Sequence, residues 1–339
     1  MALTVVAAAT LIWLAHSRFS GWTFDWRIFR TTLTSLEWSW LLAACGAVLA
    51  GYFGRALRWR VLMQPVKPDP SLWNLCSATY IGFAAITLLG RPGELVRPYL
   101  IATKENVPMS SQLAAWLLER IYDLLMVLAI FGFALARVRR SDAALGPALA
   151  WVFSTGGWFV AGISIVTLGL LVAFRHFSGP MQRRLLDALS ILPERHFSKA
   201  ERLVTAFVQG VESTRSDRAL LLLIGYTVLE WAIIAITTFC VIRAFGHAMH
   251  LGWLDVLIFL GFLAFGAVVQ IPGVGGGVQV VTVLVLTRLF GVSLEISTTV
   301  ALVLWTISFV VVVPIGVLLA IREGVRWSTI RRLEGEAGT

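Results

Sequence analysis

A series of long apolar segments decides what this chain can fold into. Several are long enough to cross a hydrocarbon core about 30 Å thick, which takes roughly 20 residues of helix. Lipid offers backbone groups no hydrogen-bond partner, so a spanning segment must be helical or part of a closed barrel. The apolar residues run continuously instead of alternating, which excludes a barrel. The sequence therefore predicts an all-α polytopic integral membrane protein, a single transmembrane domain over 1–339. Its expected apolar segments are about 1–16, 38–57, 73–90, 112–136, 148–174, 219–243, 253–270, 278–290 and 294–321.

Composition supports the membrane class and excludes several others. Hydrophobic residues make up 58% of the chain and charged residues 14%, whereas soluble domains carry about 25% charged residues. The net charge of +9 does not indicate nucleic-acid binding, because Lys and Arg concentrate between apolar segments. Cys45, Cys76 and Cys240 lack metal-ligand spacing, and no motif of a soluble enzyme site is present. We expect no metal, no cofactor and no nucleic-acid partner.

Three basic regions predict the orientation in the membrane. The loop near 55–72, the connector 175–218 and the tail 322–339 are rich in Arg and Lys, so all three should face the cytoplasm. Because three apolar segments separate the first two regions, one of them should enter and leave on the same side. We therefore expect about six full crossings of the cytoplasmic membrane, re-entrant regions at about 73–97 and 253–290, and both termini inside. The connector should include an amphipathic surface helix.

The first re-entrant region ends in the charged break Gly90–Pro98. Arg91, Glu94 and Arg97 would share one face if this stretch is helical. Pro92 favours a helix start, whose free N–H groups can hold an anion. Arginine suits bidentate recognition of phosphate. These residues are candidates for substrate binding, and the alternative is an interfacial loop whose charges reach the lipid headgroups.

Three further charges open the next apolar segment. Glu119, Arg120 and Asp123 lie within three to four residues of one another. Charges are costly in lipid, so these should pair and face the protein interior. They could form a substrate-binding cluster with Arg91 and Arg97, or a structural ion network that locks the re-entrant segment. Both interpretations remain open.

A second break, rich in glycine, interrupts the apolar run in the second half. It includes Gly275, Gly276 and Gly277, where the backbone can closely approach a ligand. Gln279 follows and could hydrogen-bond a headgroup. The alternative is tight helix packing at the glycines. Paired breaks in two halves of a membrane protein are typical of a transporter's binding site.

Two more features belong to the second half, 219–321. Glu230 is an acid in the middle of an apolar segment, so it could carry a coupled proton or pair with an arginine. The stretch Leu260–Ala264 resembles Ile81–Ala85 of the first half, 1–174. Each precedes a Pro-Gly break by about ten residues, which suggests an inverted duplication.

Three motifs resemble those of one family. They are Arg55–Arg60 with its Arg-x-x-Arg-Trp pattern, Gly90–Arg97, and Leu118–Leu124, followed by the Pro-Gly-x-Gly break. Together they resemble the lysylphosphatidylglycerol synthase transmembrane (flippase-like) family over nearly the whole chain. That family includes the membrane half of multiple peptide resistance factors, which move aminoacylated phosphatidylglycerol between leaflets. Many of its members are stand-alone membrane proteins.

The chain departs from the family in two respects. It continues for only about 18 residues beyond the last apolar segment, so we expect no aminoacyl-transferase domain and do not carry over the synthase activity. Many members have a glutamate where this chain has Gln279. The missing negative charge disfavours a lysyl headgroup and favours an anionic or neutral one.

The first functional hypothesis is a flippase or transporter for a phospholipid or polyprenyl-phosphate lipid, and not an enzyme. Arg91 and Arg97 would hold the lipid phosphate, oriented by Glu94, Glu119 and Asp123, and the glycine break would complete the pocket. A second hypothesis is an intramembrane enzyme that uses one of these acids as a base. A third is a scaffold for an envelope-lipid synthase, and a second copy of the chain is a further expected partner.

Overall fold

The computed structural model describes residues 24–138, 216–266, 270–271 and 275–325, with a few single positions between 162 and 204. The segments expected at 1–16 and across most of 148–174 lie outside the described residues. So do nearly all of the connector 175–218 and the tail beyond residue 325. The predicted count of six crossings and the surface helix of the connector therefore stay predictions.

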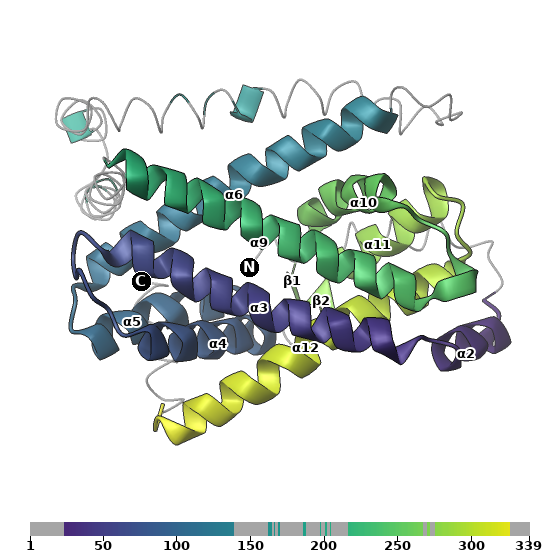
Figure 1. The fold of residues 1–339 in the computed structure, drawn as a ribbon, viewed down its shortest axis with the longest axis horizontal. Helices are drawn as coiled ribbons and strands as arrows, with labels where there is room; N and C mark the ends of the chain where they lie inside the picture. The colour runs from purple at the N-terminus through teal and green to yellow at the C-terminus, as the bar shows by residue number, and fades with distance from the viewer. Residues whose placement is uncertain are drawn as a thin grey trace.

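The described chain is helical apart from one minimal hairpin (Figure 1). Its α-helices are α2 (Trp26–Thr34), α3 (Trp38–Met63), α4 (Leu72–Leu89), α5 (Val96–Glu105), α6 (Met109–Val138), α9 (Asp217–Ala244), α10 (Trp253–Gly266), α11 (Gly277–Arg288) and α12 (Leu294–Arg322). The 3-10 helices are η1 (Arg91–Leu95) and η2 (Gly246–Ala248), and β1 (Gln270–Ile271) pairs antiparallel with β2 (Gly275–Gly276). Four described helices, α3, α4, α9 and α12, are long and apolar enough to cross a membrane. The prediction of an all-helical polytopic membrane protein is confirmed.

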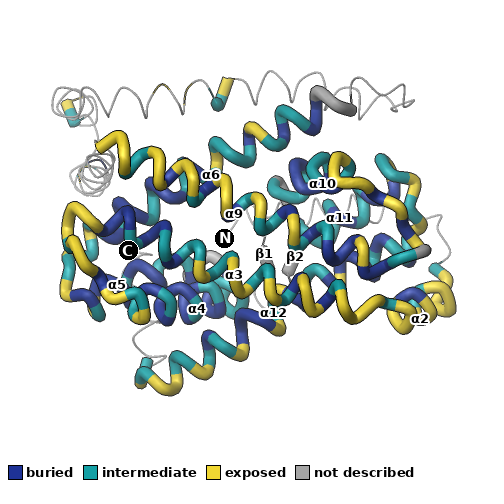
Figure 2. Tube along the Cα trace, viewed as in Figure 1, coloured by how far each residue is buried: buried dark blue, intermediate teal, exposed yellow. Residues whose placement is uncertain are grey.

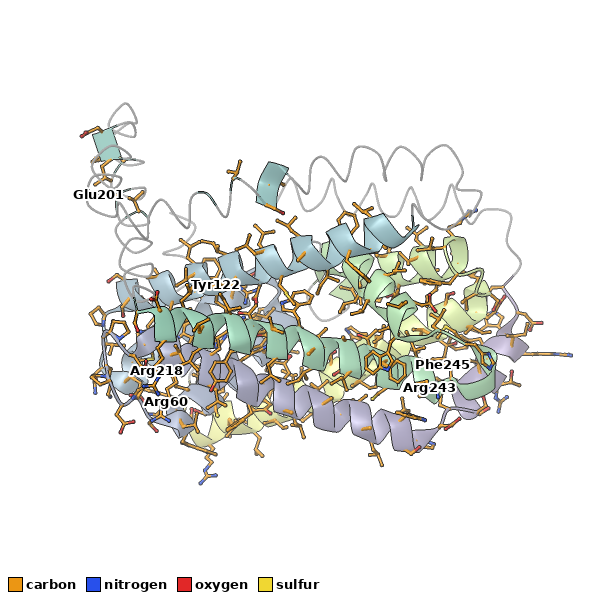
Figure 3. All side chains as sticks on the ribbon, turned by 45° about the horizontal axis from the view of Figure 1, so that its top comes forward. Arg60, Tyr122, Glu201, Arg218, Arg243 and Phe245 are labelled. Atoms are coloured by element: carbon orange, nitrogen blue, oxygen red, sulfur yellow. The ribbon has the colours of Figure 1, made fainter. Side chains whose placement is uncertain are left out.

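Helices α3 and α9 pack side by side in opposite directions (Figure 1). The backbone N–H of Glu37, just before α3, donates to the carbonyl of Ala244 at the end of α9, at 2.9 Å. Figure 3 accordingly shows Arg60 and Arg218 near one end of the pair, and Arg243 at the other. The outer faces of both helices are exposed (Figure 2) and rich in leucine, isoleucine, valine and phenylalanine. Such faces suit contact with lipid.

The described helix ends that border the three basic regions lie together at one end of the molecule. The end of α3, the start of α9 and the end of α12 share an apolar cluster that includes Met63, Leu220 and Leu319. Lys104 of α5 forms an ion pair with Glu323, which follows α12. This common end is what the distribution of positive charge requires. Which side of the membrane it faces stays a prediction.

Helix α3 corrects one expected boundary. It continues to Met63 instead of ending near residue 57, so Arg55 and Arg58 lie inside the helix and not in the basic loop. Hydropathy falls at these arginines, which is why the sequence predicted the end of the helix near residue 57. The helix continues because acidic side chains of α6 and α9 neutralise both charges.

The first break reverses the chain. Gly90 ends α4 with φ 74°, a left-handed conformation that favours glycine. η1 follows, with Pro92 near its start and Glu94 in its first turn, as the sequence predicted. The chain then returns along α4: a Cβ added to Gly82 would lie 2.5 Å from Cβ of Arg97. The structure thus has the reversal that a re-entrant region requires, while α4 alone is long enough to span. The re-entrant assignment stays a prediction.

The second break has a similar arrangement. The β1–β2 hairpin joins α10 to α11, and these two short helices pack on each other. The helix expected over 253–270 ends earlier, at Gly266, because Gln270 belongs to β1. Helix α4 packs on α12, and correspondingly α10 packs on α6. In both pairs, the helix before the break of one half packs on a long helix of the other half, as an inverted repeat would require. The duplication of the sequence itself stays a prediction.

Candidate functional site

A largely buried charge cluster joins four helices, and its α3 members lie in the last turns of that helix. Ion pairs of 4 Å or less connect its members. Helix α3 supplies two arginines, α5 one arginine, α6 two acids and an arginine, and α9 one acid. The cluster consists of Arg55, Arg58, Arg97, Glu119, Arg120, Asp123 and Glu230.

Arg58 is the centre of this charge cluster. Its side chain is 2% exposed. One terminal nitrogen lies 2.5 Å from Glu119, and the other lies 2.7 Å from Asp123 and 3.1 Å from Glu230. It also donates to the hydroxyl of Thr227 at 3.3 Å. Arg58 therefore ties α3 to α6 and α9 at once, which is a structural role.

Both terminal nitrogens of Arg97 also have hydrogen-bond partners. Its Nη1 donates to both oxygens of Glu119, at 3.1 and 3.0 Å, and its Nη2 donates to the carbonyl of Arg55 at 3.0 Å. The guanidinium carbon lies 4.0 Å from the ring centroid of Trp59. The indole of Trp59 in turn donates to Gln112 at 2.8 Å. These contacts fix α5 against α3 and α6.

Arg55 and Glu230 form one edge of the cluster. Arg55 Nη2 lies 2.9 Å from Glu230 Oε1, and its side chain is 19% exposed. The guanidinium packs over Phe83 at 4.4 Å and near Tyr52 at 5.4 Å, distances at which cation–π attraction operates. Of the two roles considered for Glu230, the structure has the pairing with arginine. Carrying a proton stays a hypothesis.

A cavity of about 390 Å³ adjoins this edge. It lies between the two halves: Ile86 and Thr87 come just before the first break, and Val278 and Gln279 come just after the second. Its volume is within the range of small-molecule sites, about 300–1,000 Å³. The remaining lining residues are Val48, Gly51, Tyr52, Arg55, Glu230, Ile233, Ile234, Thr237, Thr238, Leu263, Leu304, Trp305, Ser308 and Phe309.

The cavity is amphipathic. Arg55 and Glu230 are the charged members of its described lining, and hydroxyl side chains of α4, α9 and α12 add further polar groups. Aliphatic and aromatic side chains form the rest of the wall, including Trp305 and Phe309 of α12. A molecule with one charged end and an apolar body fits this distribution.

The structure brings together most of the residues expected to form the site. Arg97, Glu119, Arg120, Asp123 and Glu230 belong to the charge cluster. Glu94 lies in η1 and forms no ion pair with Arg97 or any other residue within the described part of the chain; its expected part in orienting the arginines of the break stays a prediction. The side chain of Arg91 lies outside the described residues.

Gln279, which follows the glycine break, contributes to the wall of the cavity. Its Oε1 accepts a hydrogen bond from the N–H of Gly276 at 2.7 Å, which caps α11, and its side chain also lines the cavity. Gly276 has φ 139°, a conformation that favours glycine. Gly277 is buried at the start of α11, whereas Gly275 is described only as part of β2.

Sequence reasoning missed Arg55 and Arg58 as site residues. It assigned them to a basic loop, although Arg-x-x-Arg spacing places both on one face of a helix. Within the described residues, no group of three or more His, Cys, Asp or Glu side chains is arranged to hold a metal ion. Arginines lie between the three acids of the cluster and already neutralise them.

Comparison with known proteins agrees with this architecture. No curated protein sequence matches the chain. The family model of the lysylphosphatidylglycerol synthase TM region matches residues 1–316. This match includes both breaks and every member of the charge cluster, so the chain belongs to the lysylphosphatidylglycerol synthase transmembrane family.

Proposed function

We propose that this protein is a lipid transporter. It moves the headgroup of a phospholipid or polyprenyl-phosphate lipid between the leaflets of the cytoplasmic membrane, with both termini in the cytoplasm, and it makes no covalent change to the lipid. The observation that carries the proposal is the amphipathic cavity, which lies where the two broken segments meet and has an ion pair in its wall.

The geometry suggests how such a step would proceed. A charged headgroup is costly in hydrocarbon, and a buried ion pair lowers this cost by offering it a partner. The headgroup would occupy the polar end of the cavity beside Arg55 and Glu230, while the chains stay along the apolar wall and in the bilayer. The sequence has no ATP-binding motif. Transport would therefore be passive or ion-coupled, with Glu230 as the candidate proton carrier.

Transport by the purified protein tests this function. The protein is placed in liposomes with acyl-labelled phosphatidylglycerol, and the label reaching the outer leaflet is extracted with albumin. Thr237 lines the cavity, so Thr237→Trp should fill it and slow exchange at least about tenfold. Ile236→Trp is the matched control, because Ile236 is 43% exposed on the outer face of the same helix.

Three results would contradict the proposal. Exchange in protein-containing liposomes could equal that in empty ones, which favours a scaffold. Thr237→Trp could exchange lipid as fast as Ile236→Trp. Mass spectrometry of the recovered lipid could show a chemically modified headgroup, which would make the protein an enzyme.

A further inference from the structure

The charge cluster contains one more positive charge than negative charges. Within the described residues, its ion pairs connect four arginines with three carboxylates. With all seven groups ionised, the net charge is therefore +1. The excess positive charge lies partly at the surface, because the side chain of Arg120 is 41% exposed. The cluster as a whole can therefore accept one anion from outside without acquiring a net negative charge.

Only one of the four arginines faces the cavity in the described lining, and it is Arg55. Arg58 is 2% exposed and contacts all three acids. Arg97 is 4% exposed, and its terminal nitrogens donate hydrogen bonds to Glu119 and to a backbone carbonyl. Arg120 lies 3.8 Å from Glu119 and from Asp123, away from the cavity lining. An anion in the cavity would therefore meet the guanidinium of Arg55.

If Glu230 loses its ion pair with Arg55, it still has Arg58 as a partner. Its Oε1 lies 2.9 Å from Arg55, and its Oε2 lies 3.1 Å from Arg58. Within the described residues, Oε2 makes no hydrogen bond, so it has capacity to tighten on Arg58. If Arg55 turns to an external anion, the remaining three arginines and three carboxylates balance. Glu230 thus acts as an exchangeable partner of Arg55.

We infer that Arg55 binds the phosphate of a lipid headgroup, which replaces Glu230 as its ion-pair partner. This inference rests on the proposed function and assigns the headgroup contact to a residue other than Arg91 or Arg97. A guanidinium group offers two parallel donors to phosphate oxygens. The rings of Phe83 and Tyr52 contact the guanidinium of Arg55 and help to fix its orientation. The apolar wall with Trp305 and Phe309 accepts the adjoining chain. The ligand class is a lipid whose phosphate carries one uncompensated negative charge.

Calorimetry of the purified protein in neutral detergent tests the ligand class. The probe is dioctanoyl phosphatidylglycerol, compared with dioctanoylglycerol, which lacks phosphate, and with glycerol 3-phosphate, which lacks chains. Both comparison compounds should bind at least about tenfold more weakly than the phospholipid, because each lacks one of the two contacts. Equal binding of glycerol 3-phosphate would overturn the lipid assignment, and equal binding of dioctanoylglycerol would overturn the phosphate assignment.

Substitutions in the ion pair test the residue. Arg55→Gln should weaken phosphatidylglycerol binding at least about tenfold, because a charged hydrogen bond is lost. Glu230→Gln should strengthen binding, because the competing carboxylate is gone. The double variant restores the net charge of the cluster yet should bind as poorly as Arg55→Gln. Arg60→Gln, on the same helix but paired with the exposed Asp69, is the matched control and should bind normally.

The double variant makes the test independent of folding and of net charge. It removes the pair together and leaves neither partner buried alone, so it should elute and unfold like the wild type. If it or Arg55→Gln binds phosphatidylglycerol with wild-type affinity, or if Glu230→Gln weakens binding, the inference is wrong. If the wild type binds phosphatidylglycerol through Arg55 but does not exchange it between leaflets, the proposed function fails and this site remains.

Discussion

At the scale of residues, Glu119 contributes most to holding the charge cluster together. It lies 2.5 Å from Arg58 and 3.0 Å from Arg97, and its side chain is 1% exposed. It thereby neutralises one arginine from α3 and one from α5. Arg58 has two further carboxylate partners, but for Arg97 the described ion pairs include no carboxylate other than Glu119.

Replacing Glu119 should therefore be strongly destabilising. Glu119→Gln leaves the buried Arg97 without its carboxylate partner and removes one of the three carboxylates around Arg58, and the expected loss is about 3–5 kcal/mol of unfolding free energy. Asp69→Asn is the control: its ion pair with Arg60 is exposed, so it should cost less than about 1 kcal/mol. Denaturant unfolding in micelles measures both. Similar losses in the two variants would show that the cluster does not brace the fold.

A second residue-scale prediction concerns pH. Glu105 lies outside the predicted spans, forms an ion pair with Lys67 Nζ at 2.7 Å and accepts a hydrogen bond from Asn74 Nδ2. Burial acts to raise the pKa of Glu105, but the contacts with Lys67 and Asn74 outweigh it and hold the pKa below the ordinary 4.5. Because the folded state favours the carboxylate, the stabilisation is complete above pH 4.5 and is lost as pH falls through the folded pKa.

The test compares unfolding of the wild type and Glu105→Gln in micelles at pH 7 and pH 3. The wild type should be the more stable protein at pH 7, and the difference should shrink at pH 3. A difference that stays constant over this range would mean that ionised Glu105 contributes nothing specific.

At the scale of elements, the close approach of α5 to α4 sets the position of Arg97. The chain reverses at Gly90 and places Arg97 against Gly82, where no side chain fits between the helices. Hydropathy indicated that the apolar run ends here, and the Pro-Gly pair indicated a break. Neither pattern specifies the distance between two helices. In the sequence, Gly82 stands out only as part of a weak repeat, and its packing role is visible only in the structure.

Gly82→Ala should disturb this hairpin. The added Cβ would lie 2.5 Å from Cβ of Arg97 and 3.1 Å from its backbone, so α5 must shift. The expected cost is about 1–3 kcal/mol, together with weaker lipid binding because Arg97 braces Arg55 through its carbonyl. Gly46→Ala on α3 is the matched control: its Cβ would meet nothing within 4 Å, so it should be neutral or slightly stabilising. Equal behaviour of the two variants would contradict the tight packing.

At the scale of the whole molecule, α3 and α9 are antiparallel, and the described helix ends that border the three basic regions lie together. We predict from the charge distribution that this end faces the cytoplasm. In a variant without the natural cysteines, Asp69→Cys and Arg322→Cys should react with an impermeant maleimide only in inside-out vesicles. Thr34→Cys precedes α3 and lies at the opposite end, so it should react only in right-side-out vesicles. Labelling of all three positions from one side would refute this topology.

Local patterns along the chain predicted the features that depend on neighbouring residues. Continuous apolar runs predicted a helical membrane protein, Pro-Gly clusters located both breaks, and isolated charges in apolar segments located five of the seven cluster members. Which charges pair depends on how the helices pack, and no local pattern contains that information. Arg58 meets Glu119 and Glu230 across 61 and 172 residues of chain, and hydropathy scores arginine as a loop residue wherever it occurs. Burying such a charge depends on partners from other helices, so helix packing alone reveals Arg55, Arg58 and the cavity beside them.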